Sequence, residues 1–244
     1  GYDAPAGSLE RKLLRRSIVR HPNLYRSLGL SYEHVRKCGA LVVAWTEEEK
    51  AGLNQILREN IDAGDIESRL ISKEELAIIE PSINKTALGA VIAPREVVAE
   101  PWLIPISFAN SALLHGATIK TGEECVSASY DANRRVWSVK TQDGKIYTSK
   151  VVINCAGLYG DDVQEMIDLG CKTSSMTAKF KILPRKGQFV VFDGKNQANT
   201  GNYPDMVIQP VPTPRTKGII VWKSVYGNII IGPTAEDQIS KDDR

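Results

Sequence analysis

Residues 150–162, KVVINCAGLYGDD, contain a β-branched run that ends at Ala156-Gly157 and passes directly into a helical pattern. Val151–Ile153 suit a strand that is buried on both faces, as in a parallel sheet. Gly157 lets the backbone turn and lets a bulky ligand approach closely. The helix expected over about 158–169 directs its first amide groups toward the carboxyl edge of the strand, which favours phosphate or other polar ligand atoms. The same arrangement also occurs in α/β proteins that bind nothing there, so this segment alone leaves both interpretations open.

Several further segments carry a family resemblance, and they occur in a fixed order along the chain. They are GYDAPAGSL at the start, IIEPSI at 78–83, REVVAEPWLIPISFANSALLHGATI at 95–119 and VVINCAGLYGDD at 151–162. Together they resemble the D-amino-acid-oxidase-type FAD-dependent oxidoreductases. Within that superfamily, the chain most resembles the glycerol-3-phosphate dehydrogenase and L-2-hydroxyglutarate oxidase group. Two later segments carry this closer resemblance, FKILPRKGQFVVFD at 180–193 and PVPTPRTKGIIVWKSVYGNIIIGPTAED at 210–237.

The resemblance implies a mixed α/β (α+β) fold. It comprises a partial FAD/NAD(P)-binding Rossmann-like domain plus a substrate domain with an antiparallel sheet and helices. We expect residues 1–30 to be a helix of the FAD-binding domain and 31–94 the first part of the substrate domain. Residues 95–178 would return to the FAD-binding domain with a β-meander, and 179–244 would form the second, truncated part of the substrate domain.

One motif of such flavoproteins is absent from these 244 residues. The FAD pyrophosphate is held by a strand, a GxGxxG turn and a helix, and no GxGxxG occurs in the sequence. The chain starts at Gly1 without a Met and stops at Arg244 just after GPTAED. We therefore expect an internal fragment of a flavoenzyme that is inactive by itself, and we expect FAD to belong to the full-length parent.

The composition excludes several other classes of protein. With 42% hydrophobic and 25% charged residues the chain can bury a core, and its net charge of +2 argues against a nucleic-acid surface. No apolar stretch approaches the roughly 20 residues of a membrane span. The four cysteines show no CxxC spacing, so we expect structural thiols, with zinc or disulfides as the alternative. The expected location is intracellular, cytoplasmic or mitochondrial, and any targeting segment would precede Gly1.

Capping signals predict the helices. Ser8 should cap an amphipathic helix over about 8–28 that Pro22 could kink. Thr46 begins TEEE and should open a helix to about Asn60, and Ser72-x-x-Glu75 should open a short helix that Pro81 ends. A further helix is expected over 101–115, closed by Gly116 in a left-handed cap.

Alternating or β-branched runs predict the strands. The set comprises 34–45, 87–93, 118–120, 124–130, 134–140, 145–148, 150–154, 179–183, 188–192, 206–210, 218–223 and 228–231, with a loop at 197–205.

The resemblance assigns the cofactor contacts to two places. Val126 would meet the FAD adenine through its main-chain N–H and C=O, although a plain buried valine is an equal alternative. Ala156, Gly157 and Leu158 match the family's AG turn beside the flavin. Asp161 and Asp162 fall in the first turn of the following helix. We interpret them as capping the helix dipole and expect no metal, because consecutive helical positions point about 100° apart.

An oxidase of a small anionic alcohol needs a cation for the anionic group and a base for the hydroxyl proton. The cations whose flanking motifs match the family are Arg185, Arg215, Lys217 and Lys223. The base is unknown, because the hydroxyglutarate-oxidizing relatives place a histidine where this chain has Ile220. The chain's histidines are His21, His34 and His115, and the last suits a capping role at a helix end.

The sequence therefore favours a piece of an FAD-dependent oxidoreductase that oxidizes a small anionic alcohol of the glycerol 3-phosphate or 2-hydroxy acid type. A flavoenzyme of the same fold that oxidizes amines or amino acids is the first alternative. A noncatalytic interaction module is the second. The substrate identity, the electron acceptor and the oligomeric state are left open.

Overall fold

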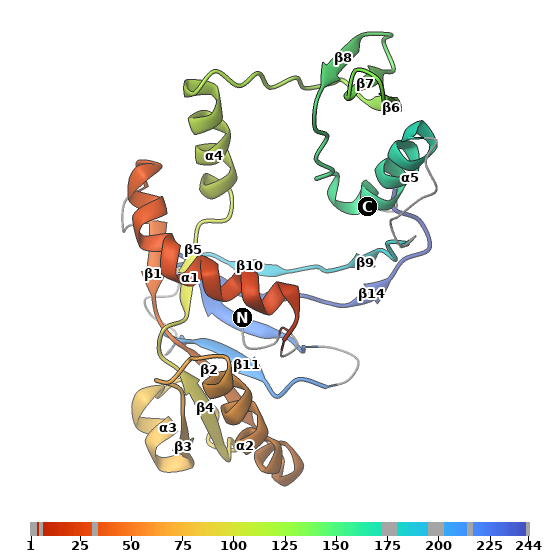
Figure 1. Cartoon of the computed structure of the whole chain (residues 1–244). Coiled ribbons are helices and arrows are strands. Elements are labelled where there is room, and N and C mark those ends of the chain that lie inside the picture. The colour runs from red at the N-terminus through yellow and green to blue at the C-terminus, as the bar shows by residue number, and fades with distance from the viewer. Residues whose placement is uncertain are drawn as a thin grey trace. The chain divides into compact units, whose positions relative to one another are not determined.

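The computed structural model describes residue 4 and residues 7–30, 34–171, 180–194, 203–213 and 217–242 (Figure 1). Two compact units make up the chain. Unit 1 comprises Gly1–Ala117 and Gly187–Ala235, and unit 2 comprises Thr118–Lys186 and Glu236–Arg244. The chain thus passes from one unit to the other more than once. The predicted domain assignment stays a prediction, because the compactness of a unit does not show which part binds a cofactor.

Unit 1 is built on a seven-stranded sheet. Strands β2 and β11 pair in parallel, whereas the other neighbouring strands of the sheet pair antiparallel. The strand order is β10 (Val190–Phe192), β13 (Ile229–Gly232), β12 (Ile220–Lys223), β11 (Val207–Pro210), β2 (Ala40–Ala44), β4 (Gly89–Ala93) and β3 (Arg69–Ser72). A separate antiparallel pair joins β1 (Val35–Lys37) to β5 (Val97–Ala99).

The core of unit 1 forms on both faces of β2, whose five residues are all buried. Because side chains alternate along a strand, Leu41 and Val43 face one cluster, which includes Leu76 of α3 (Lys73–Ile79). Val42 and Ala44 face the opposite cluster, which includes Leu53 of α2 (Glu47–Asp62). The prediction of a buried strand within 34–45 is confirmed at β2, although residues 35–37 form the separate strand β1 of another sheet.

The predicted helix caps are confirmed. Helix α1 (Leu9–Ser27) is continuous past Pro22, and its N-cap Ser8 accepts a hydrogen bond from the Arg11 amide. Thr46 and Glu49 form a reciprocal capping box on α2. Ser72 caps α3 by accepting from the Glu75 amide. Gly116 follows α4 (Leu103–Leu114) with a φ of +89°, as a left-handed cap requires.

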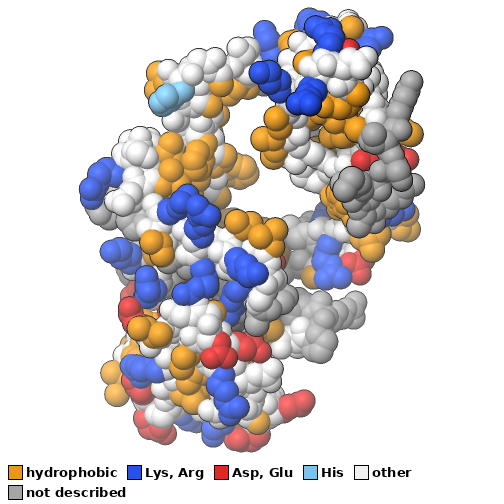
Figure 2. All heavy atoms as spheres, viewed as in Figure 1, with side chains coloured by type: hydrophobic (Ala, Val, Ile, Leu, Met, Phe, Trp, Pro, Cys, Tyr) orange, Lys and Arg blue, Asp and Glu red, His pale blue; other side chains and the backbone are white. Residues whose placement is uncertain are grey.

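Helix α4 is apolar on all sides, yet none of its residues is buried. Hydrophobic side chains gather over it in Figure 2, and they include the exposed Ile106, Phe108 and Leu114. A helix with apolar residues all round is normally covered by other parts of a protein. Within the described residues, therefore, α4 presents an open apolar surface of the kind that protein contacts use.

Unit 2 contains the predicted β-meander and one helix. Strands β6 (Cys125–Asp131), β7 (Val136–Thr141) and β8 (Ile146–Ser149) pair antiparallel in sequence order. Helix α5 (Gly160–Cys171) packs on β6, where a side chain at Gly170 would collide with the Ala128 carbonyl oxygen. A short antiparallel pair joins β9 (Arg185–Lys186) to β14 (Glu236–Asp237).

The prediction of a buried strand at 150–154 is wrong. Residues 151–156 form no strand, and the side chains of Val151 and Ile153 are 66% and 79% exposed. A β-branched run becomes a strand only when a neighbouring strand satisfies its backbone, and no described residue pairs with this run. The predicted strand at 118–120 and the described part of the one at 179–183 are absent for the same reason, whereas β3, β5, β9 and β14 were not predicted. Residue 179 of the predicted strand and residues 197–202 of the predicted loop lie outside the described residues.

A buried carboxylate fixes the start of β11. Glu80, in the IIEPSI segment, is 2% exposed, and its carboxylate accepts the amides of Asp205 and Met206 at 2.9 and 3.1 Å. Its other oxygen accepts the Ser82 hydroxyl. Arg36 donates to the carbonyl oxygens of Asp205 and Lys223 at 2.7 and 2.9 Å. These contacts join segments that are far apart in the sequence.

We expect Glu80→Gln to lower the free energy of unfolding by about 2 kcal/mol, because hydrogen bonds to a buried charge are replaced by weaker ones. Urea unfolding would show this as a lower midpoint at an unchanged slope. The matched control is Glu48→Gln on α2, an exposed position, which should stay within about 0.5 kcal/mol of the wild type. Equal losses in the two variants would contradict a structural role for the Glu80 carboxylate.

Candidate flavin-facing turn

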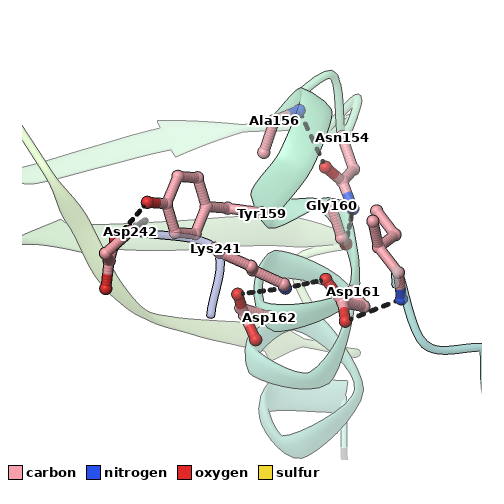
Figure 3. Close-up of polar contacts among 9 residues, drawn as sticks. Asn154, Ala156, Tyr159, Gly160, Asp161, Asp162, Lys241 and Asp242 are labelled. Carbon is pink, nitrogen blue, oxygen red and sulfur yellow. Dashed lines mark hydrogen bonds and ion pairs between the residues drawn. The ribbon is translucent and has the colours of Figure 1, made fainter. Parts of the chain in front are cut away.

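Asn154 holds the turn that precedes α5. Its Oδ1 accepts the Ala156 amide at 3.2 Å, and its Nδ2 donates to the Gly160 carbonyl oxygen at 2.7 Å (Figure 3). Between these anchors lies a short 3₁₀ helix, η2 (Gly157–Tyr159), which leads directly into α5. The amide side chain thus connects both ends of the turn and fixes its backbone.

The glycine in this turn has an open space beside it. Gly157 has a φ of +57°, in the left-handed region that favours glycine. A Cβ atom placed there would meet nothing within 4 Å. On either side of Gly157, the Ala156 residue is half-buried and the Leu158 residue is exposed. A ligand could therefore approach the Gly157 backbone without displacing any described side chain of unit 2.

One lysine joins the two carboxylates that follow the turn. The Lys241 ammonium contacts Asp161 Oδ1 and lies 2.7 Å from Asp162 Oδ2 (Figure 3). The expectation that consecutive helical positions suit one ion poorly concerned a metal ion, and the Lys241 ammonium group reaches both carboxylates. Both residues do lie in the first turn of α5, as predicted. Among the described residues, no group of three or more His, Cys, Asp or Glu side chains could hold a metal.

Tyr159 adds a second link to the same C-terminal segment. Its hydroxyl donates to Asp242 Oδ1 at 2.6 Å, and the Lys241 ammonium lies 5.6 Å from the centre of its ring. Asp161 uses its other oxygen to accept the Ile182 amide at 3.0 Å. The sequence did not reveal Asn154, Lys241 or Asp242 as part of this cluster, because no local pattern indicates which distant segment covers a helix start.

Val126 lies at an irregularity of the meander. The register of β6 on β7 pairs Cys125 with Thr141 and Ser127 with Lys140, so it passes over Val126. Such a bulge leaves an extra residue outside the ladder. The side chain of Val126 is 48% exposed. The alternative of a plain buried valine is therefore wrong, and the position suits recognition through the main chain.

None of the four cysteines forms a disulfide bond within the part of the chain that the structure describes. Cys125 and Cys155 are exposed beside Val126 and Ala156. Cys38 is half-buried, and this burial raises the pKa of its thiol.

The candidate substrate cations are held in different surroundings. Arg185, in unit 2, forms an ion pair with Asp237 across the β9–β14 pair, with 2.6 Å between Nε and Oδ1. Lys223, in unit 1, lies 2.6 Å from Asp205 Oδ1. Lys217, also in unit 1, is exposed just before β12. Arg215 lies outside the described residues.

The position that carries histidine in the hydroxyglutarate-oxidizing relatives is part of the core here. Ile220 packs against Ala40, Ala93 and Val207, so no proton acceptor occupies that place. His115 follows α4 as its C-cap residue, and its Nδ1 lies 2.7 Å from the Ser111 carbonyl oxygen. The predicted capping role of His115 is confirmed.

The FAD dependent oxidoreductase family model matches residues 1–244, and the chain belongs to this family. A glycerol 3-phosphate dehydrogenase from Caloramator mitchellensis is 32% identical over 242 residues, which cover 99% of this chain and 46% of that protein. The mitochondrial L-2-hydroxyglutarate dehydrogenase of Homo sapiens is 26% identical over 240 residues, which cover 93% of this chain and 48% of that protein. The chain thus spans about half the length of these relatives.

A solved structure has a similar fold over almost the whole chain. The dithionite-reduced, FAD-bound L-α-glycerophosphate oxidase from Mycoplasma pneumoniae matches with a TM-score of 0.82 at 24% identity, covering 99% of this chain and 60% of that one. A glycine oxidase from Geobacillus kaustophilus matches with a TM-score of 0.76 at 17% identity. These structures confirm the predicted mixed fold of FAD oxidoreductases. No described helix is both long enough and apolar enough to span a bilayer.

The Lys241 contact predicts a pH dependence. The Lys241 ammonium, with help from the Ile182 amide, lowers the pKa of Asp161 to about 2. Because this pKa lies below that of an unfolded aspartate, about 3.9, the contact stabilises the fold above about pH 4 and is lost as the pH falls toward 2. We expect the difference in unfolding free energy between the wild type and Asp161→Asn to shrink across this window. Urea unfolding at pH 5, 4 and 3 measures it, and a constant difference would contradict the assignment.

Proposed function

We propose that this chain is part of an FAD-dependent oxidoreductase that oxidizes a small anionic alcohol, with glycerol 3-phosphate as the first candidate. Membership of the FAD dependent oxidoreductase family over all 244 residues supports the reaction class. Relatives named for glycerol 3-phosphate and for L-2-hydroxyglutarate support the substrate class, because both compounds are secondary alcohols with an anionic group.

The observation that carries this proposal is the open left-handed turn at Gly157. A flat ring system can approach the backbone there because no described side chain of unit 2 fills the space. Ala156, Gly157 and Leu158 would line the flavin, and the main chain of Val126 would hold the adenine. When bound, FAD would supply the acceptor for a hydride from the substrate carbon. The residues present therefore fit this cofactor.

The candidate cations for the anionic group of the substrate are Arg185, Arg215, Lys217 and Lys223, whose flanking motifs match the family. Lys217 is exposed, and an ammonium group can bind phosphate or carboxylate oxygens. Arg185 and Lys223 already form ion pairs with Asp237 and Asp205. A role in substrate binding would require each of them to exchange a carboxylate of the protein for one of the substrate.

Ile220 supports a second candidate function. Its side chain is partly buried against a hydrophobic cluster and cannot accept a proton from a hydroxyl group. An amine or amino-acid substrate can react in its deprotonated form and needs no strong base. The alternative is therefore a flavoenzyme of the same fold that oxidizes amines or amino acids.

Spectroscopy on an extended chain separates these functions. The extension is an N-terminal strand, GxGxxG turn and helix fused before Gly1. We expect a yellow protein whose flavin absorbance is bleached under anaerobic conditions by glycerol 3-phosphate and not by amino acids. Bleaching by amino acids alone would favour the second function, and a colourless, folded protein would favour a noncatalytic interaction module.

We expect Gly157→Val to abolish flavin binding in the extended chain, because the new side chain would fill the space proposed for the ring. Gly116→Val is the matched control, since Gly116 also has a positive φ and open space around it. Both variants should lose about 1–2 kcal/mol of stability through backbone strain. The amount of flavin bound per protein after gel filtration compares the two variants. Equal flavin binding by Gly157→Val and Gly116→Val would contradict a flavin site at the Gly157 turn.

A further inference from the structure

Residues 241–242 cover the segment that follows Gly157, although they lie about 80 positions further along the sequence. Lys241 contacts Asp161 and Asp162, and Asp242 accepts the hydroxyl of Tyr159 (Figure 3). We call these five residues the clasp. Because Tyr159 ends η2 and Asp161 lies in the first turn of α5, the clasp contacts the residues that closely follow the open glycine.

The clasp is shielded from solvent at its centre. The side chain of Lys241 is 16% exposed and that of Asp161 is 10% exposed, whereas Asp162 is 60% exposed. Burial alone would disfavour the charged lysine, yet the hydrogen bonds to Asp161 and Asp162 raise the pKa of Lys241 above its usual value. Lys241 therefore carries its charge at the place where two carboxylates meet.

The net charge at the start of α5 affects how strongly an anionic ligand can bind there. Asp161 and Asp162 together contribute two negative charges in the first turn of α5, and Lys241 neutralises one of them. Without the ammonium, the carboxylates would oppose the positive end of the α5 dipole, which otherwise favours anions. FAD carries a negatively charged pyrophosphate, so the extra negative charge would weaken its binding.

We propose that Lys241 is a positioning residue for the flavin-facing turn. It acts in two ways, by holding Tyr159 and α5 in place behind Gly157 and by limiting the negative charge beside the site. This inference rests on the proposed function only in its second part. The first part concerns contacts within unit 2 and can be tested without any flavin.

Hydrogen exchange on the 244-residue chain tests the positioning. The Tyr159 amide donates to the Ala156 carbonyl at 3.1 Å and the Gly160 amide to that of Gly157, so both report on the turn. We expect Lys241→Met to speed exchange at these amides on the order of tenfold and to leave the β6–β8 amides unchanged. Lys140→Met, at an exposed lysine of β7, is the matched control and should change neither set. Unchanged exchange at Tyr159 and Gly160 in Lys241→Met would overturn the positioning role.

Lys241→Arg guards against a general loss of folding. Arginine keeps the charge and can contact both carboxylates, so exchange at the turn should stay within about threefold of the wild type. Lys241→Met could unfold the whole unit. In that case, the clasp is still supported if Lys241→Arg speeds exchange only at the Tyr159 and Gly160 amides and leaves exchange at the β6–β8 amides unchanged. Exchange in Lys241→Arg that rises equally over the whole unit would overturn it.

The affinity of the extended chain for FAD tests whether Lys241 limits the negative charge beside the site. We expect Lys241→Met to weaken FAD binding about tenfold, which corresponds to about 1.4 kcal/mol. Adding Asp162→Asn restores the original net charge, so the double variant should recover most of this affinity while its amide exchange stays fast. A double variant that binds FAD no better than Lys241→Met would overturn the electrostatic part. If the parent extended chain binds no FAD, the proposed function fails, and the exchange experiment still decides the positioning.

Discussion

The parallel pairing of β2 with β11 is the constraint on which the rest of unit 1 depends. Residues 40–43 lie beside residues 207–210, so strands about 170 positions apart form neighbouring parts of one sheet. Both faces of β2 are buried, and its apolar side chains anchor the two main clusters. Because this pairing closes unit 1 across a long separation, Thr118–Lys186 within the intervening chain can belong to unit 2. Glu80 and Arg36 reinforce the closure by binding the start of β11.

Within unit 2, the candidate site is a turn whose backbone is held by hydrogen bonds and whose glycine is uncovered. Asn154 and the clasp fix the backbone around Gly157, whereas no described side chain of the unit covers the glycine itself. Preorganised backbone that remains uncovered is typical of a ligand site, because the cost of ordering it is met during folding rather than on binding. The bulge at Val126 adds a second place where the main chain is available for recognition.

Local signals in the sequence predicted the helices well. Ser8, Thr46 and Ser72 begin helices where their side chains can accept a backbone amide, and these contacts need only three or four neighbouring residues. The buried strand at 40–44 and the β-meander were predicted because their patterns match the period of a strand. The family itself was identified from motifs in order, and the comparisons confirm it.

The remaining features depend on contacts between distant segments, which a single sequence does not specify. Val151–Ile153 have the composition of a buried strand but no described partner to pair with, so the prediction was wrong. Lys223 stays a predicted substrate cation, and no local pattern indicated that it forms an ion pair with Asp205. No sequence pattern predicted a role for Lys241 in the polar C-terminal stretch, although it contacts two carboxylates at the start of α5.

A crystal structure of the extended chain with FAD is the most direct test of the central claim. The account predicts flavin density in van der Waals contact with the Gly157 backbone, and adenine density against the main chain of Val126. Flavin density remote from Gly157, with the turn covered by side chains of the protein, would contradict it.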